Sequence, residues 1–361
     1  MNWKEFEQRF PIQLNTQQKE AVQSVDGPVL LLAVPGSGKT TVLVTRLGYM
    51  VYCKGIDPSK ILTVTYTVAA TKDMAKRFAG YFGNDMAERL EFRTINGICA
   101  KIIQYYGKMV GRTAFELVRD EKMTAGLLSK IYQQVQHEFA TESDLKNVRT
   151  LITYIKNMML SEEEILKLDE KEEMKISIIY KEYCRQLREH HLMDYDDQMV
   201  YAYTMLRKFP QLLEHFQNLY PYICVDEAQD TSKIQHAIIA LLASKTENLF
   251  MVGDEDQSIY GFRAAYPEAL LSFEKNHANA RVLLMEDNFR SNASIVEAAD
   301  QFIQKNTLRH EKHMRATKER MEEIKEISLK SRKAQYSYLM KVADGCTTQT
   351  AVLYRDNECI L

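Results

Sequence analysis

Two groups of residues in this 361-residue chain have the chemical character to handle a phosphate group. The first is a small-residue stretch, AVPGSGKTT, which begins at Ala33 after an apolar run. Gly36 and Gly38 let the backbone approach an anion closely, because glycine has no Cβ. Lys39 can reach the β- and γ-phosphates of a nucleotide, and the Thr40 hydroxyl can hold Mg²⁺. The phosphate-loop pattern G-x-x-x-x-G-K-[ST] is met except at its first position, which is Ala33.

The second group is an acidic pair, Asp226 and Glu227, at the end of the apolar run Tyr222–Val225. In a protein with a phosphate loop, Asp226 can hold the Mg²⁺ shell, and Glu227 can orient and deprotonate the attacking water. The alternatives are structural: the acidic pair caps the next helix, and the Gly-Lys-Thr turn merely caps another. The loop and the acidic pair together favour a nucleoside triphosphate site.

Three further polar residues could serve this site. Gln18 would be a surface glutamine by itself, but its place shortly before the loop makes it a candidate to hydrogen-bond an adenine edge. Gln257 follows an apolar run, where a neutral amide could sense the γ-phosphate. Arg290 would act as an arginine finger if it faced the nucleotide from a second domain. The predicted catalytic residues are Lys39, Glu227, Gln257 and Arg290. The predicted nucleotide contacts in the loop are Pro35, Gly36, Ser37, Gly38, Lys39, Thr40 and Thr41.

Aromatic and basic residues close to Gln257 would suit a nucleic-acid surface. Tyr260, Phe262 and Arg263 place two rings and a guanidinium near one another, which suits stacking on exposed bases. Packing in the core is the alternative for either ring, and for Tyr260 the two interpretations are equally supported. Composition does not decide, because the net charge is −2 and the basic segment 305–333 is more typical of a solvated helix face.

Alternating strand and helix patterns must position these residues. Helical patterns begin at Lys39 and cover 69–81 and about 98–106. Such alternation around a phosphate loop predicts an α/β fold with a parallel, doubly wound sheet. Apolar, β-branched runs predict strands from Leu30 to the loop and at 61–66, 92–95, 222–225, 249–252 and 281–285.

The domain organisation follows from where the strand pattern stops. Between about 101 and 194 helical spacing dominates, which predicts an all-helical insertion into the α/β domain. The strand at 281–285 looks like the start of a second α/β domain, which would end in a strand at 351–354. The predicted domains are a first ATP-binding domain (1–100 and 195–280), a helical insertion (101–194) and part of a second domain (281–361).

Composition also indicates the compartment. No run of about 18 apolar residues occurs, so no membrane span is expected. The first residues carry acids and lack an apolar core, so they are not a secretory signal. The six cysteines include no C-x-x-C pair, which favours reduced thiols in the cytoplasm over a disulfide framework or a zinc site.

Seven separated blocks, in this order, resemble the motifs of the UvrD/Rep/PcrA group of superfamily 1 DNA helicases. The resemblance covers essentially the whole chain, and segments near 306–312 and 351–357 also fit. The blocks are the Q motif (14–18), motif I (33–40), motif Ia (65–74), the end of the helical insertion (193–197), motif II (225–231), motif III (253–263) and motif IV (288–291).

The resemblance implies two RecA-like domains that bind ATP and Mg²⁺ between them, and movement 3′→5′ on single-stranded DNA or a 3′-tailed duplex. A role in DNA repair or recombination would follow. Phe289 would stack on the adenine in place of the usual tyrosine. Thr65 and Tyr66, in motif Ia, would contact single-stranded DNA. The implied lining of the strand channel is Tyr66, Tyr260, Phe262 and Arg263.

The sequence departs from the family pattern in several places. Thr41 stands where many relatives have an arginine that stacks on adenine. Val68–Thr71 replaces the usual Asn-Lys-Ala-Ala, and Thr94–Gly97 replaces T-x-H-S. Motifs V and VI do not occur before Leu361, so we expect either a piece of a longer helicase or a chain completed by a partner.

The sequence is compatible with three functions. A DNA-stimulated ATPase motor is favoured, because each residue that hydrolysis needs up to motif IV is present. The rival is a non-hydrolysing scaffold that binds ATP and DNA and is completed by a partner chain. A small-molecule kinase is disfavoured, because such an enzyme needs neither the Gly-Asp-x-Asp-Gln block nor the Asn-Phe-Arg-Ser block.

Overall fold

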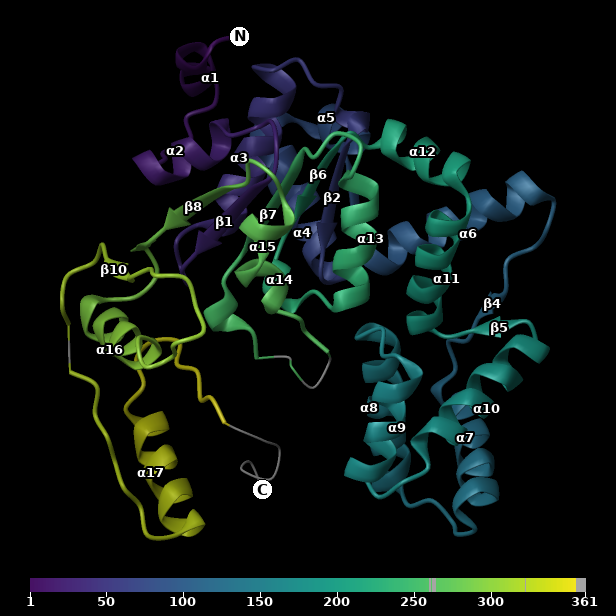
Figure 1. The fold of residues 1–361 in the computed structure, drawn as a ribbon. Helices are drawn as coiled ribbons and strands as arrows, with labels where there is room; N and C mark the ends of the chain where they lie inside the picture. Colours follow the sequence, from purple (N-terminus) through teal and green to yellow (C-terminus); the bar gives the residue numbers. More distant parts are fainter. Residues whose placement is uncertain (260, 262–263, 322, 355–361) are drawn as a thin grey trace. The chain divides into compact units, whose positions relative to one another are not determined.

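The structure is a computed structural model that describes residues 1–259, 261, 264–321 and 323–354. The chain forms two compact units, Met1–Glu319 and Arg320–Leu361. The first unit contains a six-stranded parallel sheet with the strand order β3-β2-β6-β7-β1-β8 (Figure 1). Its strands are β1 (Val29–Ala33), β2 (Ile61–Thr65), β3 (Glu91–Thr94), β6 (Tyr222–Val225), β7 (Leu249–Gly253) and β8 (Arg281–Met285).

The central strands are apolar runs that are buried on both faces. Every residue of β1, β2 and β7 is buried, as expected for a parallel sheet with helices on both sides. Successive side chains of a strand point to opposite faces. Accordingly, Leu30 and Leu32 of β1 belong to the core on one face, and Leu31 and Ala33 belong to the core on the other.

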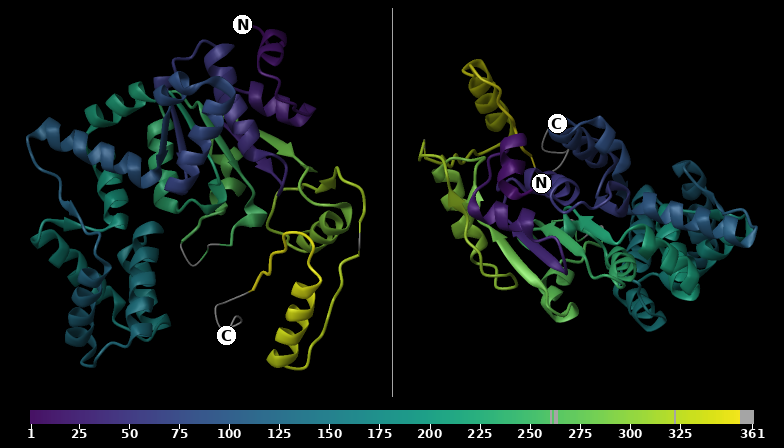
Figure 2. Two further views of the ribbon diagram at one scale, coloured as in Figure 1. Left: turned by 180° about the vertical axis from the view of Figure 1, so that it is seen from behind. Right: turned by 90° about the horizontal axis from the view of Figure 1, so that it is seen from above.

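Two groups of helices supply the cores on the two faces (Figures 1 and 2). One face packs against α6 (Ile95–Val110), α11 (Tyr195–Lys208), α12 (Pro210–Leu219), α13 (Lys233–Ala243), α14 (Glu268–Leu271) and α15 (Phe273–Asn276). The other face packs against α1 (Trp3–Arg9), α2 (Thr16–Gln23), α3 (Lys39–Tyr52), α4 (Val68–Phe82) and α5 (Asn84–Arg89). Short 3₁₀ turns are η1 (Pro58–Lys60), η2 (Ala228–Asp230) and η3 (Glu255–Gln257).

The predicted helical insertion is present and has a core of its own. The two chain segments that connect it to the sheet pair in parallel as β4 and β5. Its elements are β4 (Glu116–Leu117), α7 (Glu121–Gln136), α8 (Glu142–Asn157), α9 (Glu162–Lys171), α10 (Ile176–Glu189) and β5 (Leu192–Met193). The α/β fold with a parallel sheet and a helical insertion is therefore confirmed. The boundary predicted at 101 is wrong, because it falls inside α6, whose buried residues Ile102 and Ile103 belong to the sheet's core.

Lys156, near the end of α8, attaches the insertion to the start of α11. Its side chain is 1% exposed, and its Nζ lies 2.7 Å from Asp194 Oδ2 and 2.8 Å from Asp197 Oδ1. Asp194 also caps α11 by accepting a hydrogen bond from Asp197 N. The same two carboxylates therefore begin a helix of the α/β domain and bind a lysine of the insertion.

The domain boundary predicted at 281 is also wrong. Residues 281–285 form β8, which pairs with β1 at the edge of the first sheet, with Val282 opposite Leu30 and Leu284 opposite Leu32. An apolar pattern predicts that a strand forms, but it does not determine which strand it pairs with. After β8 the first unit contains β9 (Asp287–Asn288), α16 (Ala293–Ile303) and β10 (Arg315–Ala316), and among the described strands β9 pairs with β10 alone.

The described residues of the second unit form one helix, α17 (Arg332–Asp344), and every residue of this helix is at least partly exposed. Residues 351–354, the last that the structure describes, do not form the strand predicted there, and no described strand lies beside them to pair with their backbone. Within the described part of the chain, no helix has the length and apolar character that crossing a membrane requires.

Candidate nucleotide-binding site

The predicted phosphate loop leads from β1 directly into α3. Gly36 and Gly38 have φ values of +72° and +87°, in the left-handed region that glycine adopts without strain. Gly38 caps α3 without a side-chain hydrogen bond, so the first N–H groups of that helix are free of a side-chain cap. Exposed N–H groups and the positive end of a helix dipole together favour an anion. Thr40 and Thr41 follow Lys39 in the first turn of α3.

Ser37 supplies independent support for a ligand at this loop. The residue is 1% exposed, and its Oγ has no hydrogen-bond partner among the described residues. Buried hydroxyls nearly always have a partner, and an orphaned one often marks a site that a ligand completes. The loop therefore fits a phosphate group.

The acidic pair lies against the loop. Lys39 Nζ is 3.0 Å from Glu227 Oε2, although 188 positions separate the two residues in sequence. Glu227 has φ +49° and ψ 48°, a left-handed conformation that is uncommon for a residue with a side chain. Backbone strain of this kind is often kept at functional sites.

Asp226 is 9% exposed at the end of β6. Burial, and after it the charge of the neighbouring Glu227, raise the pKa of Asp226 to about 6, although Lys39 opposes the rise. A cation beside this carboxylate would lower its pKa again, because the ionised form would then gain a partner.

Mg²⁺ fits this chemistry only together with a nucleotide. No group of three or more His, Cys, Asp or Glu side chains in the described part of the chain could hold a metal ion by itself. Magnesium is commonly held by one or two protein oxygens together with phosphate oxygens and waters. The Thr40 hydroxyl and the Asp226 carboxylate are oxygens of the right kind, and they come from the two elements that the Lys39–Glu227 contact joins.

The side chain of Gln18 binds the backbone of the loop. Its Nε2 donates to the Ser37 carbonyl at 2.9 Å, and its Oε1 accepts from Asn15 N at 2.9 Å as part of the capping box of α2. Both polar ends of the Gln18 side chain therefore have partners in the protein. Its predicted contact with adenine stays a prediction, and the second N–H of the amide would be the group to make it.

The turn after β8 also forms hydrogen bonds with the backbone of the loop. Asn288 Nδ2 donates to the Pro35 carbonyl at 2.7 Å, while its Oδ1 accepts from Arg290 N and Ser291 N at 2.9 and 2.8 Å. The N–H of Phe289 donates to the Gly36 carbonyl at 3.0 Å. This turn brings Phe289 and Arg290, both exposed residues, next to Gly36 of the phosphate loop.

Asn288 is a functional candidate that the sequence analysis missed. It is 4% exposed, and an amide is suited to the position because it donates and accepts at the same time. Its type and its place before Phe289 were visible in the sequence, but nothing there indicated that it would contact Pro35.

A second glutamine links the acidic pair to motif III. Gln229 Nε2 donates to Glu227 Oε2 at 2.8 Å, and Gln229 Oε1 accepts from Asp254 N at 3.1 Å. Gln257, predicted to sense the γ-phosphate, donates from Nε2 to Asp254 Oδ2 at 2.8 Å. Sequence reasoning missed Gln229, whose only signal was its place within motif II.

The predicted DNA contacts are described only in part. Thr65 is buried at the end of β2, and its hydroxyl donates to the Thr67 carbonyl at 3.2 Å. Tyr66 follows and is 36% exposed. Tyr260, Phe262 and Arg263 lie outside the residues that the structure describes.

Comparison with known proteins identifies the family. Residues 14–278 match the UvrD/REP helicase N-terminal domain. The chain is 34% identical over 302 residues to the ATP-dependent DNA helicase PcrA of Staphylococcus aureus strain COL, a match that covers 83% of this chain and 41% of that relative. It is 30% identical over 351 residues to the PcrA of Staphylococcus epidermidis strain ATCC 12228, with 95% of this chain and 48% of the relative covered. The chain thus spans less than half the length of these relatives, and by its family match it belongs to the UvrD/REP helicases.

Proposed function

We propose that this chain is the ATP-binding part of a DNA helicase that couples hydrolysis of ATP to 3′→5′ movement along single-stranded DNA, in repair or recombination. The observation that carries the proposal is the contact between Lys39 and Glu227 at 3.0 Å. This contact supports the proposal because Lys39 is suited to hold a triphosphate and Glu227 is suited to activate water. The names of the relatives, both ATP-dependent DNA helicases, support the same function.

The residues divide the work between binding and hydrolysis. Lys39 holds the β- and γ-phosphates, and Thr40 and Asp226 are the proposed Mg²⁺ ligands. Bound Mg²⁺ would neutralise the charge that develops on the phosphates. Glu227 orients and deprotonates the attacking water, and Arg290 approaches the γ-phosphate from the turn after β8.

The contact partners of Lys39 suggest how binding prepares hydrolysis. A triphosphate offers Lys39 a more highly charged partner than the single carboxylate of Glu227. When Lys39 turns to the phosphates, the carboxylate of Glu227 is released to accept a proton from water. Gln229 donates to the same oxygen of Glu227 and keeps the side chain in place.

The test is steady-state ATPase activity of the 361-residue chain with and without single-stranded DNA. We expect DNA-stimulated turnover that Glu227→Gln abolishes while nucleotide binding is kept. Glu274→Gln, at an exposed position of α15, is the matched control and should change nothing. Nucleotide binding without turnover would instead assign the non-hydrolysing scaffold that a partner chain completes.

Movement is tested separately by unwinding of tailed duplexes. A 3′-tailed duplex should be unwound and a 5′-tailed duplex should not. Equal activity on both would contradict the proposed direction.

A further inference from the structure

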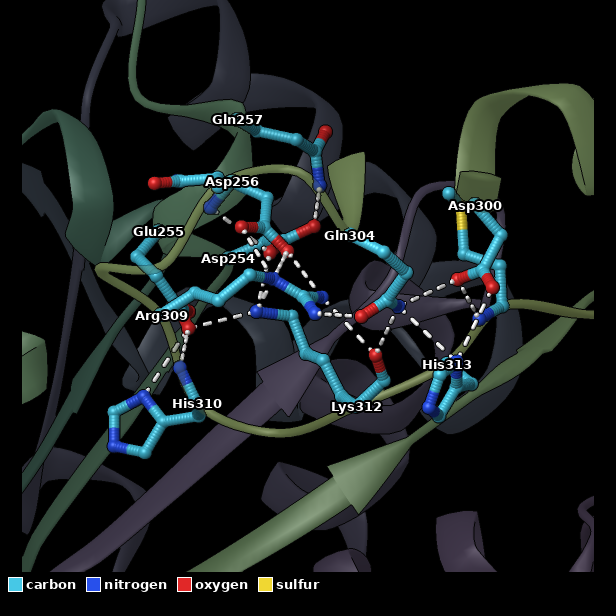
Figure 3. Close-up of polar contacts among 12 residues, drawn as sticks. Asp254, Glu255, Asp256, Gln257, Asp300, Gln304, Arg309, His310, Lys312 and His313 are labelled. Atoms are coloured by element: carbon cyan, nitrogen blue, oxygen red, sulfur yellow. Dashed lines mark hydrogen bonds and ion pairs between the residues drawn. The ribbon is translucent and has the colours of Figure 1, made fainter. Parts of the chain in front are cut away.

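Three consecutive carboxylates directly after β7, those of Asp254, Glu255 and Asp256, meet one lysine from a distant part of the chain (Figure 3). Lys312 is 1% exposed, and its Nζ lies between 2.7 and 3.2 Å from an oxygen of each carboxylate. A buried ammonium group without a partner is strongly destabilising. The carboxylates therefore hold Lys312 at this turn.

The backbone around Lys312 is also fixed. Arg309 donates from Nε and Nη2 to both oxygens of Asp256 at 2.8–3.0 Å, in the forked geometry that suits a carboxylate. The Lys312 carbonyl accepts from Arg309 Nη2 and from Gln304 Nε2, each at 3.0 Å. The position of Lys312 therefore depends on the docking of the whole segment 304–313 (Figure 3).

Asp254 divides its two oxygens between Lys312 and Gln257. Its Oδ1 lies 3.2 Å from the Lys312 ammonium, and its Oδ2 accepts from Gln257 Nε2 at 2.8 Å. The amide nitrogen of Gln257 carries two hydrogens, so this bond orients the amide and leaves one N–H and the carbonyl oxygen for a ligand. Asp254 is 1% exposed and cannot turn without giving up a partner.

Electrostatics make Asp254 depend on the lysine. Burial raises the pKa of Asp254, and Lys312 opposes that rise. Burial alone would lower the pKa of Lys312, but the surrounding carboxylates outweigh it and hold the pKa above its ordinary value. Without Lys312, Asp254 would be a buried carboxylate with no lysine beside it. Such a group binds a proton or turns toward water, and either change removes the charged acceptor of Gln257.

We propose that Lys312 is a positioning residue for ATP hydrolysis, which orients the Gln257 amide through Asp254 and does so only while the segment 304–313 is docked. This proposal rests on the proposed function, in which Gln257 senses the γ-phosphate. Docking of the segment then controls turnover and leaves nucleotide binding almost unchanged.

The test is a double-mutant cycle of Lys312→Met and Gln257→Ala in the full chain, with DNA-stimulated kcat and the Kd of a fluorescent ATP analogue as readouts. Each single variant should lower kcat about tenfold or more, and the double variant should lose little beyond either single one, because the two residues act as a unit. The Kd should stay within about twofold of the wild type, since neither residue belongs to the loop.

Lys156→Met is the matched control, because Lys156 is as buried as Lys312 and is also bound by carboxylates, but far in sequence from motif III. At a temperature where all variants are folded, it should lose stability without a comparable loss of kcat. Lys305→Met tests an exposed lysine of the same region and should leave kcat unchanged. If Lys312→Met does not fold, Lys312→Gln keeps a hydrogen-bond donor without the charge and replaces it in the cycle.

A second readout does not need turnover. The side-chain amide signal of Gln257 in an NMR spectrum, assigned by its loss in Gln257→Ala, should shift in Lys312→Met and stay in place in Lys156→Met. An unchanged kcat in folded Lys312→Met, additive losses in the cycle, or an unmoved Gln257 signal would each overturn the proposal. Absence of turnover in the wild type would instead contradict the proposed function, and the amide signal would still decide whether Lys312 orients Gln257.

Discussion

The side chains of Lys39 and Glu227 hold each other at 3.0 Å, and each is suited to a second partner in a nucleotide complex. Lys39 can exchange the carboxylate for phosphate oxygens, and Glu227 can exchange the ammonium group for water. Gln229 contacts the same oxygen of Glu227, so that the carboxylate keeps one fixed partner through the exchange. In the proposed function, the chemistry of the site therefore depends on single side chains that change partners.

Replacement of Lys39 by alanine should abolish ATP hydrolysis and leave the fold intact. The residue lies in the first turn of α3 and its side chain reaches out of the core to Glu227, so its loss removes phosphate binding and little packing. We expect kcat to fall about 100-fold or more. The measurement is steady-state ATPase activity with a thermal melt, and Lys54→Ala, at an exposed position, is the control. Retained turnover would show that the loop does not bind the phosphates.

Replacement of Asp226 by asparagine should stabilise the protein at pH 8 and prevent hydrolysis. The raised pKa, about 6, means that folding favours the protonated form. The contribution of Asp226 to the free energy of unfolding is therefore most favourable below about pH 4. This contribution is lost as the pH rises to about 6. Asparagine resembles the protonated acid, so the gain should reach about 1–3 kcal/mol above pH 6 and shrink toward zero near pH 4.

Urea unfolding at pH 4 and pH 8 measures this difference between Asp226→Asn and the wild type. Asp85→Asn, at an exposed position of α5, should show little change at either pH. A gain for Asp226→Asn that is equal at both pH values would contradict a raised pKa as its cause.

On the scale of elements, the phosphate loop is held by a helix on one side and a turn on the other. Gln18 of α2 binds the Ser37 carbonyl, and Asn288 after β8 binds the Pro35 carbonyl. Two carbonyls of the loop backbone thus accept hydrogen bonds from side chains that lie outside the loop. This arrangement leaves the N–H groups at the start of α3 for a ligand.

Gly36→Ala should disturb this packing. A Cβ at Gly36 would lie 2.7 Å from Arg290 Cβ and 3.0 Å from the amide of Asn288, so the turn after β8 would have to move. Gly55→Ala is a matched control, because Gly55 has a similar φ, +69°, but no atom within 4 Å of an added Cβ. Both variants should lose about 1 kcal/mol of stability from φ alone.

Only Gly36→Ala should lose further stability, about 1–3 kcal/mol from the clash, and bind nucleotide more weakly. Urea unfolding and the Kd of a fluorescent ATP analogue are the measurements. Equal effects of the two alanines would mean that the close contact with Arg290 does not matter.

At the scale of the whole first unit, the helical insertion is attached through buried charges. Lys156 of α8 binds Asp194 and Asp197 at the start of α11, and the Asn157 amide donates to Asp196 Oδ1 at 2.7 Å. Removing one partner of a buried ion pair is costly, because the remaining charges lose their compensation. The connection therefore behaves as a specific attachment, in addition to the chain crossing at β4 and β5.

Lys156→Met should loosen this attachment and destabilise the protein by about 3–5 kcal/mol. Hydrogen exchange should rise first in α8 and at the start of α11, since these segments hold the buried charges. Lys146→Met, an exposed lysine of the same helix, is the control and should leave exchange unchanged. Protection that falls uniformly along the chain would argue against a local attachment.

Much of the fold and of the candidate site was predictable from the sequence because it depends on local patterns. The apolar runs of β1, β6 and β7, the glycines of the loop and the acidic pair are each recognisable from neighbouring residues. The strand partner of β8 was not predictable, since its apolar pattern suits any sheet. The predicted boundary at 101 failed for a similar reason, because α6 continues without a break from the sheet's core toward the insertion.

The contacts of Asn288, Gln229 and Lys312 were not predictable for a different reason. Each depends on groups that are distant in sequence or become neighbours only after the turns have formed. A polar residue type shows what a side chain can bind, but not which backbone it meets. The partners of these residues follow only from the folded chain.

The place of β8 beside β1 has a mechanical consequence. Asn288 grips the phosphate loop just three positions beyond Met285, the last residue of a strand that is hydrogen-bonded into the sheet. The chain between them is too short to contain slack. A displacement of the chain beyond Ser291 would therefore be transmitted directly to the carbonyls of the loop. Conversely, closure of the loop around a ligand would displace the chain that follows.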